Sequence, residues 1–217
     1  MKRDIILAGV GGQGILSIAA VIGMAALNSD LQLKQAEVHG MSQRGGDVHS
    51  NLRISDREIF SDLIPFGKAD LIISVEPMES LRYLPWLSSE GWLISNNVPH
   101  VNIPDYPDMG EISKVIDAVG RHVLINADEI ARDMGMLRSA NMVILGAATP
   151  WLGISYENVV TVAEKLEPVE LFDMFVDARK QFNLRIYPHT SSESTVELLS
   201  VELAGLSVAH TLTIPLS

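Results

Sequence analysis

The sequence predicts an α/β fold with three layers, in which an open and mostly parallel sheet is flanked by helices and followed by a helical C-terminal part. Two observations predict the layers. Short apolar runs alternate with longer segments of helical periodicity, and the first run ends in a glycine-rich turn directly before a helix. The helical periodicity that begins near residue 139 predicts the C-terminal part.

Several segments have the length and composition of β-strands. Strands buried on both faces are continuous apolar runs, as in residues 4–10, whereas half-exposed strands alternate. In residues 47–55 the alternation places His49 and Arg53 on one face, and the opposite face carries Val48, Ser50, Leu52 and Ile54. The predicted strands are residues 4–10, 31–38, 47–55, 69–76, 91–96 and 122–127.

The predicted helices are identified by apolar periodicity and by signals at their ends. Pro77 suits the first turn of one helix, and Asp128 is expected to cap the N-terminus of another. The predicted helices are residues 15–27, 77–87, 111–120, a short helix after Asp128, and residues 139–155, 156–166 and 168–182. Between them, residues 96–110 are expected to form an irregular, proline-containing connection, which by its length is a candidate functional or interface segment.

Two regions are expected along the chain. Residues 1–182 are predicted to form one domain, and residues 183–217 a C-terminal extension of unknown role. The extension has a weakly amphipathic pattern after a Ser/Thr-rich hinge. It could therefore form a further helix, a pair of strands or an arm that holds another subunit.

Composition excludes several classes of function. The formal net charge of −11 argues against a surface for nucleic acid or anionic membrane. The chain has no cysteine, which excludes disulfides, iron–sulfur ligation and a thiol nucleophile within it. No signal peptide is recognised at the N-terminus and no window approaches 18 consecutive apolar residues, so we expect a cytoplasmic protein without a membrane span.

The turn after the first predicted strand matches the pattern G-x-G-x-x-G. Such a turn lets the backbone approach a phosphate and places a helix N-terminus beside it. Glu37 follows about twenty residues later, where a dinucleotide-binding fold places an acid for a ribose hydroxyl. This pattern leaves open a free-standing NAD- or FAD-binding oxidoreductase, or a non-catalytic nucleotide-binding module. The residues concerned are Gly9, Gly11, Gly12, Gln13 and Gly14.

A second loop, "HGMSQRGG", follows the next predicted strand and carries more chemistry than a ribose-binding turn needs. Arg44 stands between Gln43 and the pair Gly45 and Gly46, so its guanidinium could bind a carboxylate or phosphate close to the backbone. Arg44 could therefore contact an anionic ligand or an acidic loop of another chain, or it could form an ion pair with Glu37 that holds the loop.

Other polar residues have simpler interpretations. His39 could carry a proton. His39 and His49 stand on either side of the loop, however, and histidines in such positions more often form structural hydrogen bonds. No metal site is predicted, because nothing makes their side chains converge. Glu76 closes a strand at the edge where open α/β folds bind ligands, yet it equally suits the start of the helix at Pro77.

"GVGGQGIL", followed about twenty residues later by "EVHGMSQRGGDVHSNLRIS", resembles the small subunit of indolepyruvate:ferredoxin oxidoreductase and, more broadly, the gamma-type domain of 2-oxoacid:ferredoxin oxidoreductases. The resemblance continues through "ADLIISVEPMESLRYLPWL", "GWLISNN" and "SANMVILGAA", and covers about residues 1–180. Either motif alone is weak, whereas the pair in this order is specific.

The resemblance implies that this chain is one part of a larger enzyme and that the chain alone is inactive. That enzyme decarboxylates a 2-oxo acid on thiamine diphosphate, passes the acyl group to coenzyme A and sends electrons through iron–sulfur clusters to ferredoxin. In the family the thiamine and the clusters belong to the large subunit. The glycine turn and the Arg44 loop would then face that subunit and its cofactors, in a hetero-oligomer. In such an enzyme Arg44 would contact a phosphate of coenzyme A, the carboxylate of the 2-oxo acid or an acidic loop of the partner.

Overall fold

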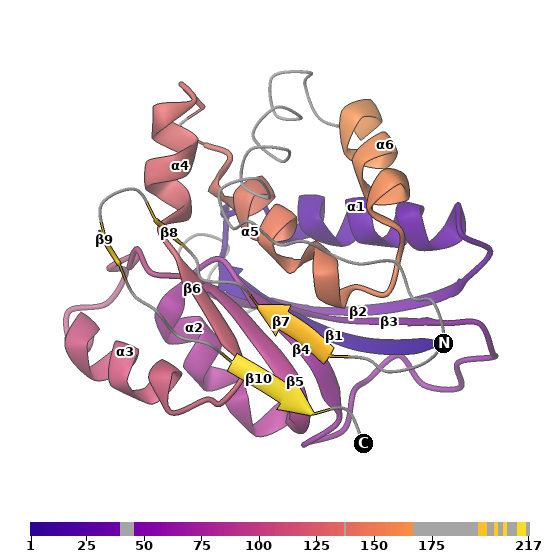
Figure 1. Cartoon of the computed structure of the whole chain (residues 1–217), viewed down its shortest axis with the longest axis horizontal. Coiled ribbons are helices and arrows are strands. Elements are labelled where there is room, and N and C mark those ends of the chain that lie inside the picture. Colours follow the sequence, from indigo (N-terminus) through magenta and orange to yellow (C-terminus); the bar gives the residue numbers. More distant parts are fainter. Residues whose placement is uncertain are drawn as a thin grey trace.

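The structure is a computed structural model that describes residues 1–39, 46–136 and 138–166, together with the backbone of four short strands beyond residue 194. One mixed sheet of six strands forms its centre, in the order β2-β3-β1-β4-β5-β6 (Figure 1). Its strands are β1 (Lys2–Val10), β2 (Gln32–His39), β3 (Asp47–Ser55), β4 (Ala69–Ser74), β5 (Leu87–Asn96) and β6 (His122–Ile125). The predicted open α/β fold is confirmed.

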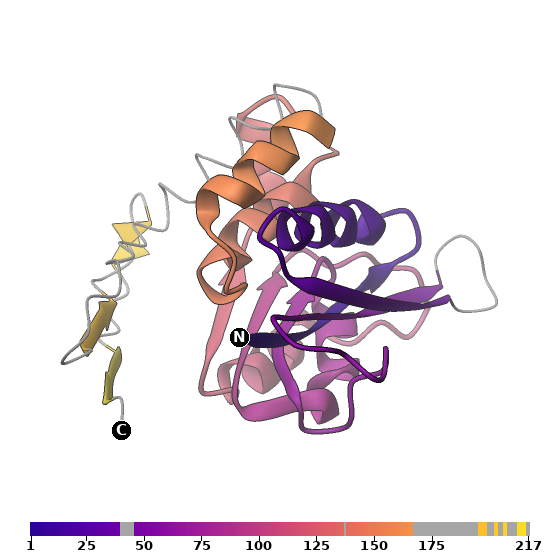
Figure 2. The same ribbon diagram turned by 90° about the vertical axis from the view of Figure 1, so that its right-hand side faces the viewer.

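The sheet has a parallel half and an antiparallel insertion. Strands β1, β4, β5 and β6 pair in parallel, whereas β3 is antiparallel to both β1 and β2. Because β3 runs against its neighbours, the β2–β3 connection lies at the carboxyl edge of β1, and the β3–β4 connection lies at its amino edge. Figure 2 shows β2 and β3 extending together along one side of the molecule.

Helices cover both faces of the sheet. One hydrophobic core joins α1, α4, α5 and α6 to one face, and a second joins α2 and α3 to the other (Figure 1). Alternation along β1 explains the two cores, because Ile5 and Leu7 belong to the first core and Ile6 and Ala8 to the second. The helices are α1 (Ile15–Leu27), α2 (Pro77–Arg82), α3 (Met109–Asp117), α4 (Ala127–Asp133), α5 (Ala140–Ala148) and α6 (Tyr156–Leu166).

The start of α4 corrects one prediction. Asn126, not Asp128, is the N-cap residue, and its side-chain oxygen accepts a hydrogen bond from the backbone N–H of Glu129 at 3.0 Å. Asp128 instead lies in the first helical turn, where a negative charge suits the helix dipole. Amide and carboxylate side chains both cap helices well, so composition alone did not separate the two positions.

The segment at residues 77–87 is shorter as a helix than predicted. Helix α2 ends at Arg82, a 3-10 turn covers Leu84–Trp86, and β5 begins at Leu87. Pro85 accounts for the break, because proline lacks the N–H that a continuing α-helix needs. Residues 97–108 carry neither helix nor strand, which confirms the irregular connection predicted there.

The C-terminal region is described in part. The predicted helix at 168–182 lies outside the described residues. Within 183–217, β7 (Thr195–Leu198) pairs antiparallel with β10 (Leu212–Pro215), and β8 (Glu202–Leu203) with β9 (Leu206–Ser207). Strand pairing is thus one of the arrangements that the sequence left open. Across the described part of the chain, no helix is both long and apolar enough to cross a membrane.

Candidate functional site

A cleft of about 680 Å³ opens at the carboxyl edge of the sheet, where the parallel strands end. It lies between the turn after β1, the segments that follow β4 and β5, and the start of α5. Open α/β sheets bind ligands at this edge. Its lining residues are Gly12, Gln13, Gly14, Ser17, Val75, Asn96, Val98, Pro99, His100, Asp128, Arg138, Ser139, Ala140, Asn141 and Met142.

Hydrogen bonds within the glycine turn fix its shape. The backbone N–H of Val10 donates to the side-chain oxygen of Gln13 at 2.7 Å, and the backbone N–H of Gln13 donates to the carbonyl of Val10 at 3.1 Å. Gly9 permits this closure, because a Cβ there would lie 2.9 Å from the Gln13 oxygen. Gln13, a variable position of the pattern, therefore shapes the turn.

The two glycine-bearing loops meet in space. The backbone N–H of Gly11 donates to the carbonyl of Gly46 at 2.9 Å, which joins the turn after β1 to the end of the β2–β3 loop. Gly46 and β3 are described, whereas Gln43, Arg44 and Gly45 lie outside the described residues. The interpretations of Arg44 therefore stay predictions. The contact brings the ends of the two motifs together at the carboxyl edge of the sheet.

Gly14 ties the turn to α5. It caps α1 in the left-handed conformation at φ 78°, and a Cβ there would lie 2.4 Å from the Asn141 side-chain nitrogen. That nitrogen donates to the carbonyl of Gly14 at 3.3 Å. Among the described residues, no side chain caps the N-terminus of α1. The first turn of α1, with Ser17 and Arg138, therefore forms a wall of the cleft that favours an anionic group.

Glu37 does not occupy the position of a ribose-binding acid. It lies on β2, at the outer edge of the sheet, and it pairs with Ser50 of β3. A dinucleotide-binding sheet places its second strand directly beside the first, whereas here β3 separates β2 from β1. Two strand spacings amount to about 10 Å, so the β2 backbone is a full strand too distant from the glycine turn.

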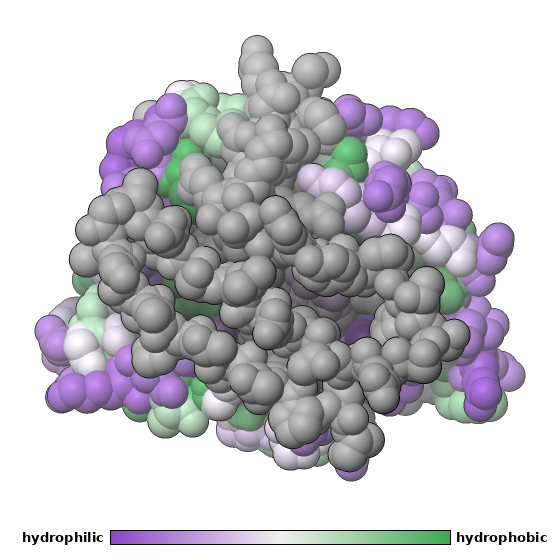
Figure 3. Space-filling model, viewed as in Figure 1, coloured by the Kyte–Doolittle hydropathy of each residue, from purple (hydrophilic) through white to green (hydrophobic). Residues whose placement is uncertain are grey.

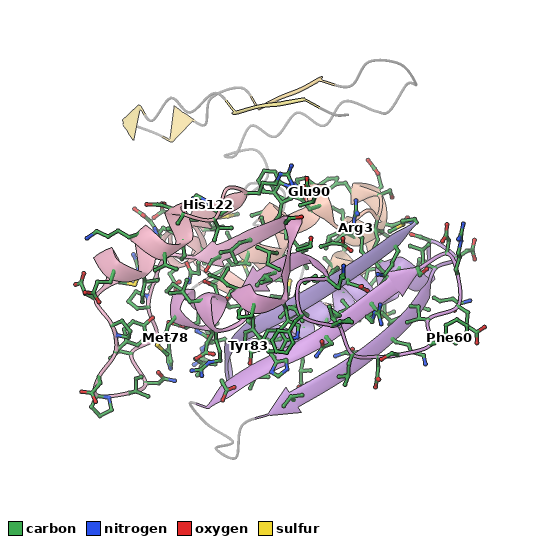
Figure 4. The ribbon with its side chains drawn as sticks, turned by 90° about the horizontal axis from the view of Figure 1, so that it is seen from below. Arg3, Phe60, Met78, Tyr83, Glu90 and His122 are labelled. Carbon is green, nitrogen blue, oxygen red and sulfur yellow. The ribbon has the colours of Figure 1, made fainter. Side chains whose placement is uncertain are left out.

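The backbone register places the two histidines in neighbouring pairs of the β2–β3 ladder. His39 is opposite Val48, and His49 is opposite Val38. The Nδ1 atom of His49 lies 2.8 Å from the hydroxyl of Tyr83, and the two rings are 4.6 Å apart. His49 is thus a packed and hydrogen-bonded residue, and its partner Tyr83 is labelled in Figure 4. The side chain of His39 lies outside the described residues.

Glu76 is a structural anchor of the cleft region. Its side chain is 0% exposed and accepts hydrogen bonds from the backbone N–H groups of Glu79 at 2.8 Å and His100 at 3.2 Å, and from the hydroxyl of Tyr106. It therefore caps α2 and holds the irregular connection 97–108 at the same time. The helix-start interpretation of Glu76 is confirmed, and the second contact adds to it.

Asn96 and Asp128 form a pair that the sequence analysis missed. The Asn96 side-chain nitrogen donates to the Asp128 carboxylate at 2.7 Å, and its oxygen accepts from the backbone N–H of Ala127 at 3.1 Å. Both residues line the cleft. Asn96 ends a predicted strand at the carboxyl edge of the sheet, and this position was the signal that could have identified it.

Comparison with known proteins assigns the family. A sequence model of the pyruvate ferredoxin/flavodoxin oxidoreductase family matches residues 4–171. The chain belongs to this family. The predicted family resemblance is therefore confirmed, and this member of the pyruvate ferredoxin/flavodoxin oxidoreductases is a subunit of an oxidoreductase.

Relatives of this oxidoreductase chain carry consistent names. The indolepyruvate oxidoreductase subunit IorB of Methanothermobacter thermautotrophicus is 38% identical, over 80% of this chain and 92% of that protein. The subunit of the same name from Pyrococcus horikoshii is 34% identical, over 83% of this chain and 97% of that protein. The keto/oxoacid ferredoxin oxidoreductase gamma subunit from Geobacter sulfurreducens has the same fold, with a TM-score of 0.59 at 22% identity over 82% of this chain and 94% of that chain.

Proposed function

We propose that this chain is the small subunit of an indolepyruvate:ferredoxin oxidoreductase that acts in the cytoplasm. The assembled enzyme would oxidatively decarboxylate indolepyruvate, or another aryl pyruvate, to an acyl-CoA and CO2 with reduction of ferredoxin. The observation that carries this proposal is the 38% identity to a relative named as an indolepyruvate oxidoreductase subunit, across nearly its whole length. The contact between Gly11 and Gly46, which joins the two paired motifs, supports it.

The division of labour between subunits follows from the residues present. The chain has no cysteine, so cysteine thiolates for iron–sulfur clusters must come from another chain. We infer that a large subunit holds the clusters and thiamine diphosphate, where the thiamine supplies the carbanion chemistry of decarboxylation. This chain would contribute binding surface, and it would be inactive alone.

The carboxyl edge of the sheet is the proposed face toward that partner and its ligands. Its candidate residues are Gly9, Gly11, Gly12, Gln13, Gly14, Glu37, Gln43, Arg44, Gly45 and Gly46. The donor-rich wall of the cleft suits an anionic group such as a phosphate of coenzyme A or the carboxylate of the 2-oxo acid. Glu37 would anchor the β2–β3 loop, and Arg44 would supply a charge to ligand or partner.

A native pull-down tests this proposal. The tagged chain, expressed in its own organism under anaerobic conditions, should recover a larger, brown, cysteine-rich protein that contains thiamine diphosphate. The recovered complex should reduce ferredoxin with indolepyruvate and coenzyme A. Indolepyruvate-dependent activity of the chain by itself, or recovery of no such partner, would refute the proposal.

The Arg44→Ala variant tests the role of the second loop. We expect it to lower the coenzyme-A-dependent turnover of the assembled enzyme about tenfold or more, because a charge-assisted contact to an anion is worth about 1.5–3 kcal/mol. The melting temperature of the isolated chain should stay nearly unchanged. Lys114→Ala, which removes an exposed positive charge on α3, is the matched control. A large fall in melting temperature for Arg44→Ala would point instead to an ion pair within the chain.

A further inference from the structure

The connection between β3 and β4 exposes a group of large apolar side chains. In this connection, residues 56–68, Phe60 is 85% exposed, Phe66 66% and Leu63 55%. We refer to residues 56–68 as the aromatic loop. It lies at the amino edge of β1, opposite the cleft, and Figure 4 shows Phe60 projecting from the rim of the molecule. Two aromatic rings in water on one short loop indicate a surface that is covered in the working protein.

The aromatic loop is held in place by buried polar groups. One guanidinium nitrogen of Arg53 donates to the carbonyls of Ser61 at 3.0 Å and Leu63 at 3.1 Å. Another nitrogen of Arg53 lies 2.7 Å from the carboxylate of Asp4, which is 0% exposed. The side chain of Asn51 accepts from the backbone N–H of Ile64 at 3.1 Å. These bonds fix the backbone of the loop, so its apolar side chains are presented in one arrangement.

Some apolar side chains of the aromatic loop are buried, and others stay exposed to solvent. Ile59 and Ile64 are buried beneath it. Phe66 stacks on Trp86 with ring centroids 4.2 Å apart, and the next backbone N–H, that of Gly67, donates to the carbonyl of Pro85 at 2.9 Å. Ile59, Ile64 and part of Phe66 thus secure the loop by packing. Most of the Phe60, Leu63 and Phe66 side chains remains exposed.

We propose that the aromatic loop is an attachment surface for the large subunit, and this inference rests on the proposed function. Aromatic side chains on a preorganised loop are the typical anchors of protein–protein interfaces, because they bury much area at little cost in conformational entropy. Exposed charged residues also stand beside these anchors along the loop, and charged residues are typical of the rim of an interface. They are three acidic residues and two basic ones: Asp56, Glu58, Asp62, Arg57 and Lys68.

Charge separates a protein partner from a membrane. The loop carries one negative charge in excess and the whole chain carries −11, so an anionic lipid surface would be repelled. An apolar hollow on another protein needs no such attraction. Figure 3 shows a mostly hydrophilic rim on the coloured part of one face, with separate hydrophobic patches, which agrees with an acidic, polar surface.

The exposed apolar area of the loop favours the large subunit over a second copy of this chain as the partner. The exposed parts of the three apolar side chains amount to about 400 Å². Two copies meeting through them would bury about 800 Å², below the roughly 1,200 Å² of a specific, stable interface. A hetero-oligomer that is also joined at the carboxyl edge would not depend on this patch alone, so about 400 Å² from this chain would suffice as a second, separate contact.

Measured affinities of separately purified subunits test the proposal. The probe is the large subunit of the same organism. The variant is Phe60→Ser, which removes a side chain that is 85% exposed and so has little packing within the chain. We expect the dissociation constant to rise about 30-fold, as for an interface anchor. Val115→Ser removes an exposed apolar side chain on α3, next to the second core, and should change the constant less than threefold.

The outcomes distinguish this inference from the function on which it rests. If the wild-type chain does not bind the large subunit, the proposed function fails and the inference fails with it. If the wild type binds and Phe60→Ser binds equally well, the inference alone is overturned. It is also overturned if the isolated chain is a dimer that Phe60→Ser dissociates, or if the wild type sediments with phosphatidylserine vesicles and Phe60→Ser does not.

Discussion

At the scale of single residues, burial controls the groups that surround the start of β3. Burial lowers the pKa of His49, and the nearby carboxylate of Asp47 opposes that shift. Burial also raises the pKa of the Tyr83 hydroxyl, which lies 2.8 Å from His49. At neutral pH both side chains are therefore uncharged, and they form a neutral hydrogen bond between β3 and the segment after α2. The bond secures the strand that begins next to Gly46.

The His49 shift predicts a pH dependence of stability. The pKa of His49 in the folded chain lies below the unfolded value of about 6.5. At pH values between these two pKa values, the unfolded chain therefore binds more protons than the folded chain. The contribution of His49 is then fully present above about pH 6.5 and is lost as the pH falls through the folded-state pKa. The free energy of unfolding, measured in urea, should fall between pH 7.5 and pH 5. We expect this fall to be smaller for His49→Gln than for the wild type. Equal losses would contradict the prediction.

At the scale of elements, local sequence determined most helices. The predicted segments 15–27 and 156–166 coincide with α1 and α6, because their signals are local: Gly14 precedes the nearly uniform apolar run of α1, and α6 has an apolar stripe at helical spacing. The exceptions lie where a proline or a competing cap intervenes, as at Pro85 and Asn126. The helix predicted over residues 139–155 likewise ends at Ala148, and a 3-10 turn with Pro150 at its centre follows. The turn between β1 and α1 differs in kind, because its shape depends on Asn141 of α5, which is remote in sequence.

Two glycine variants distinguish the effect of backbone conformation in this turn from the effect of its contact with Asn141. Gly12 has φ 97°, and a Cβ added there would have no atom of the described residues within 4 Å, so Gly12→Ala should cost only backbone strain of about 1–2 kcal/mol. Gly14→Ala adds a clash with Asn141 and the loss of its hydrogen bond, so we expect about 1 kcal/mol more. Urea unfolding measures both. Equal effects would mean that the contact with Asn141 does not constrain the turn.

At the scale of the whole molecule, strand order decides which ligand the glycine turn can serve. The sequence pattern allowed a dinucleotide, with Glu37 as the ribose-binding acid. The insertion of β3 between β1 and β2 removes the adjacency on which that role depends. In addition, Gly11 already gives its backbone N–H to Gly46. The fold therefore uses the glycine turn to join two loops at one edge of the sheet.

Dinucleotide titration checks this conclusion on the purified chain. We expect no binding of NAD, NADH or FAD at micromolar concentrations by isothermal titration calorimetry, because the acid and the turn are separated by a strand. Glu37→Gln should leave the result unchanged. Saturable micromolar binding that Glu37→Gln abolishes would restore the free-standing oxidoreductase as an interpretation.

The sequence by itself determined the alternation of strands and helices, the paired loop motifs and hence the family. These features are local, because apolar periodicity, turn residues and motif spacing are each contained in a short stretch of chain. Only the tertiary structure decided the antiparallel place of β3, the edge position of Glu37, and the cleft that Asn96, Asp128 and Asn141 share. Strand pairing and side-chain convergence depend on contacts between distant segments, and no short stretch encodes which distant segment will be the neighbour.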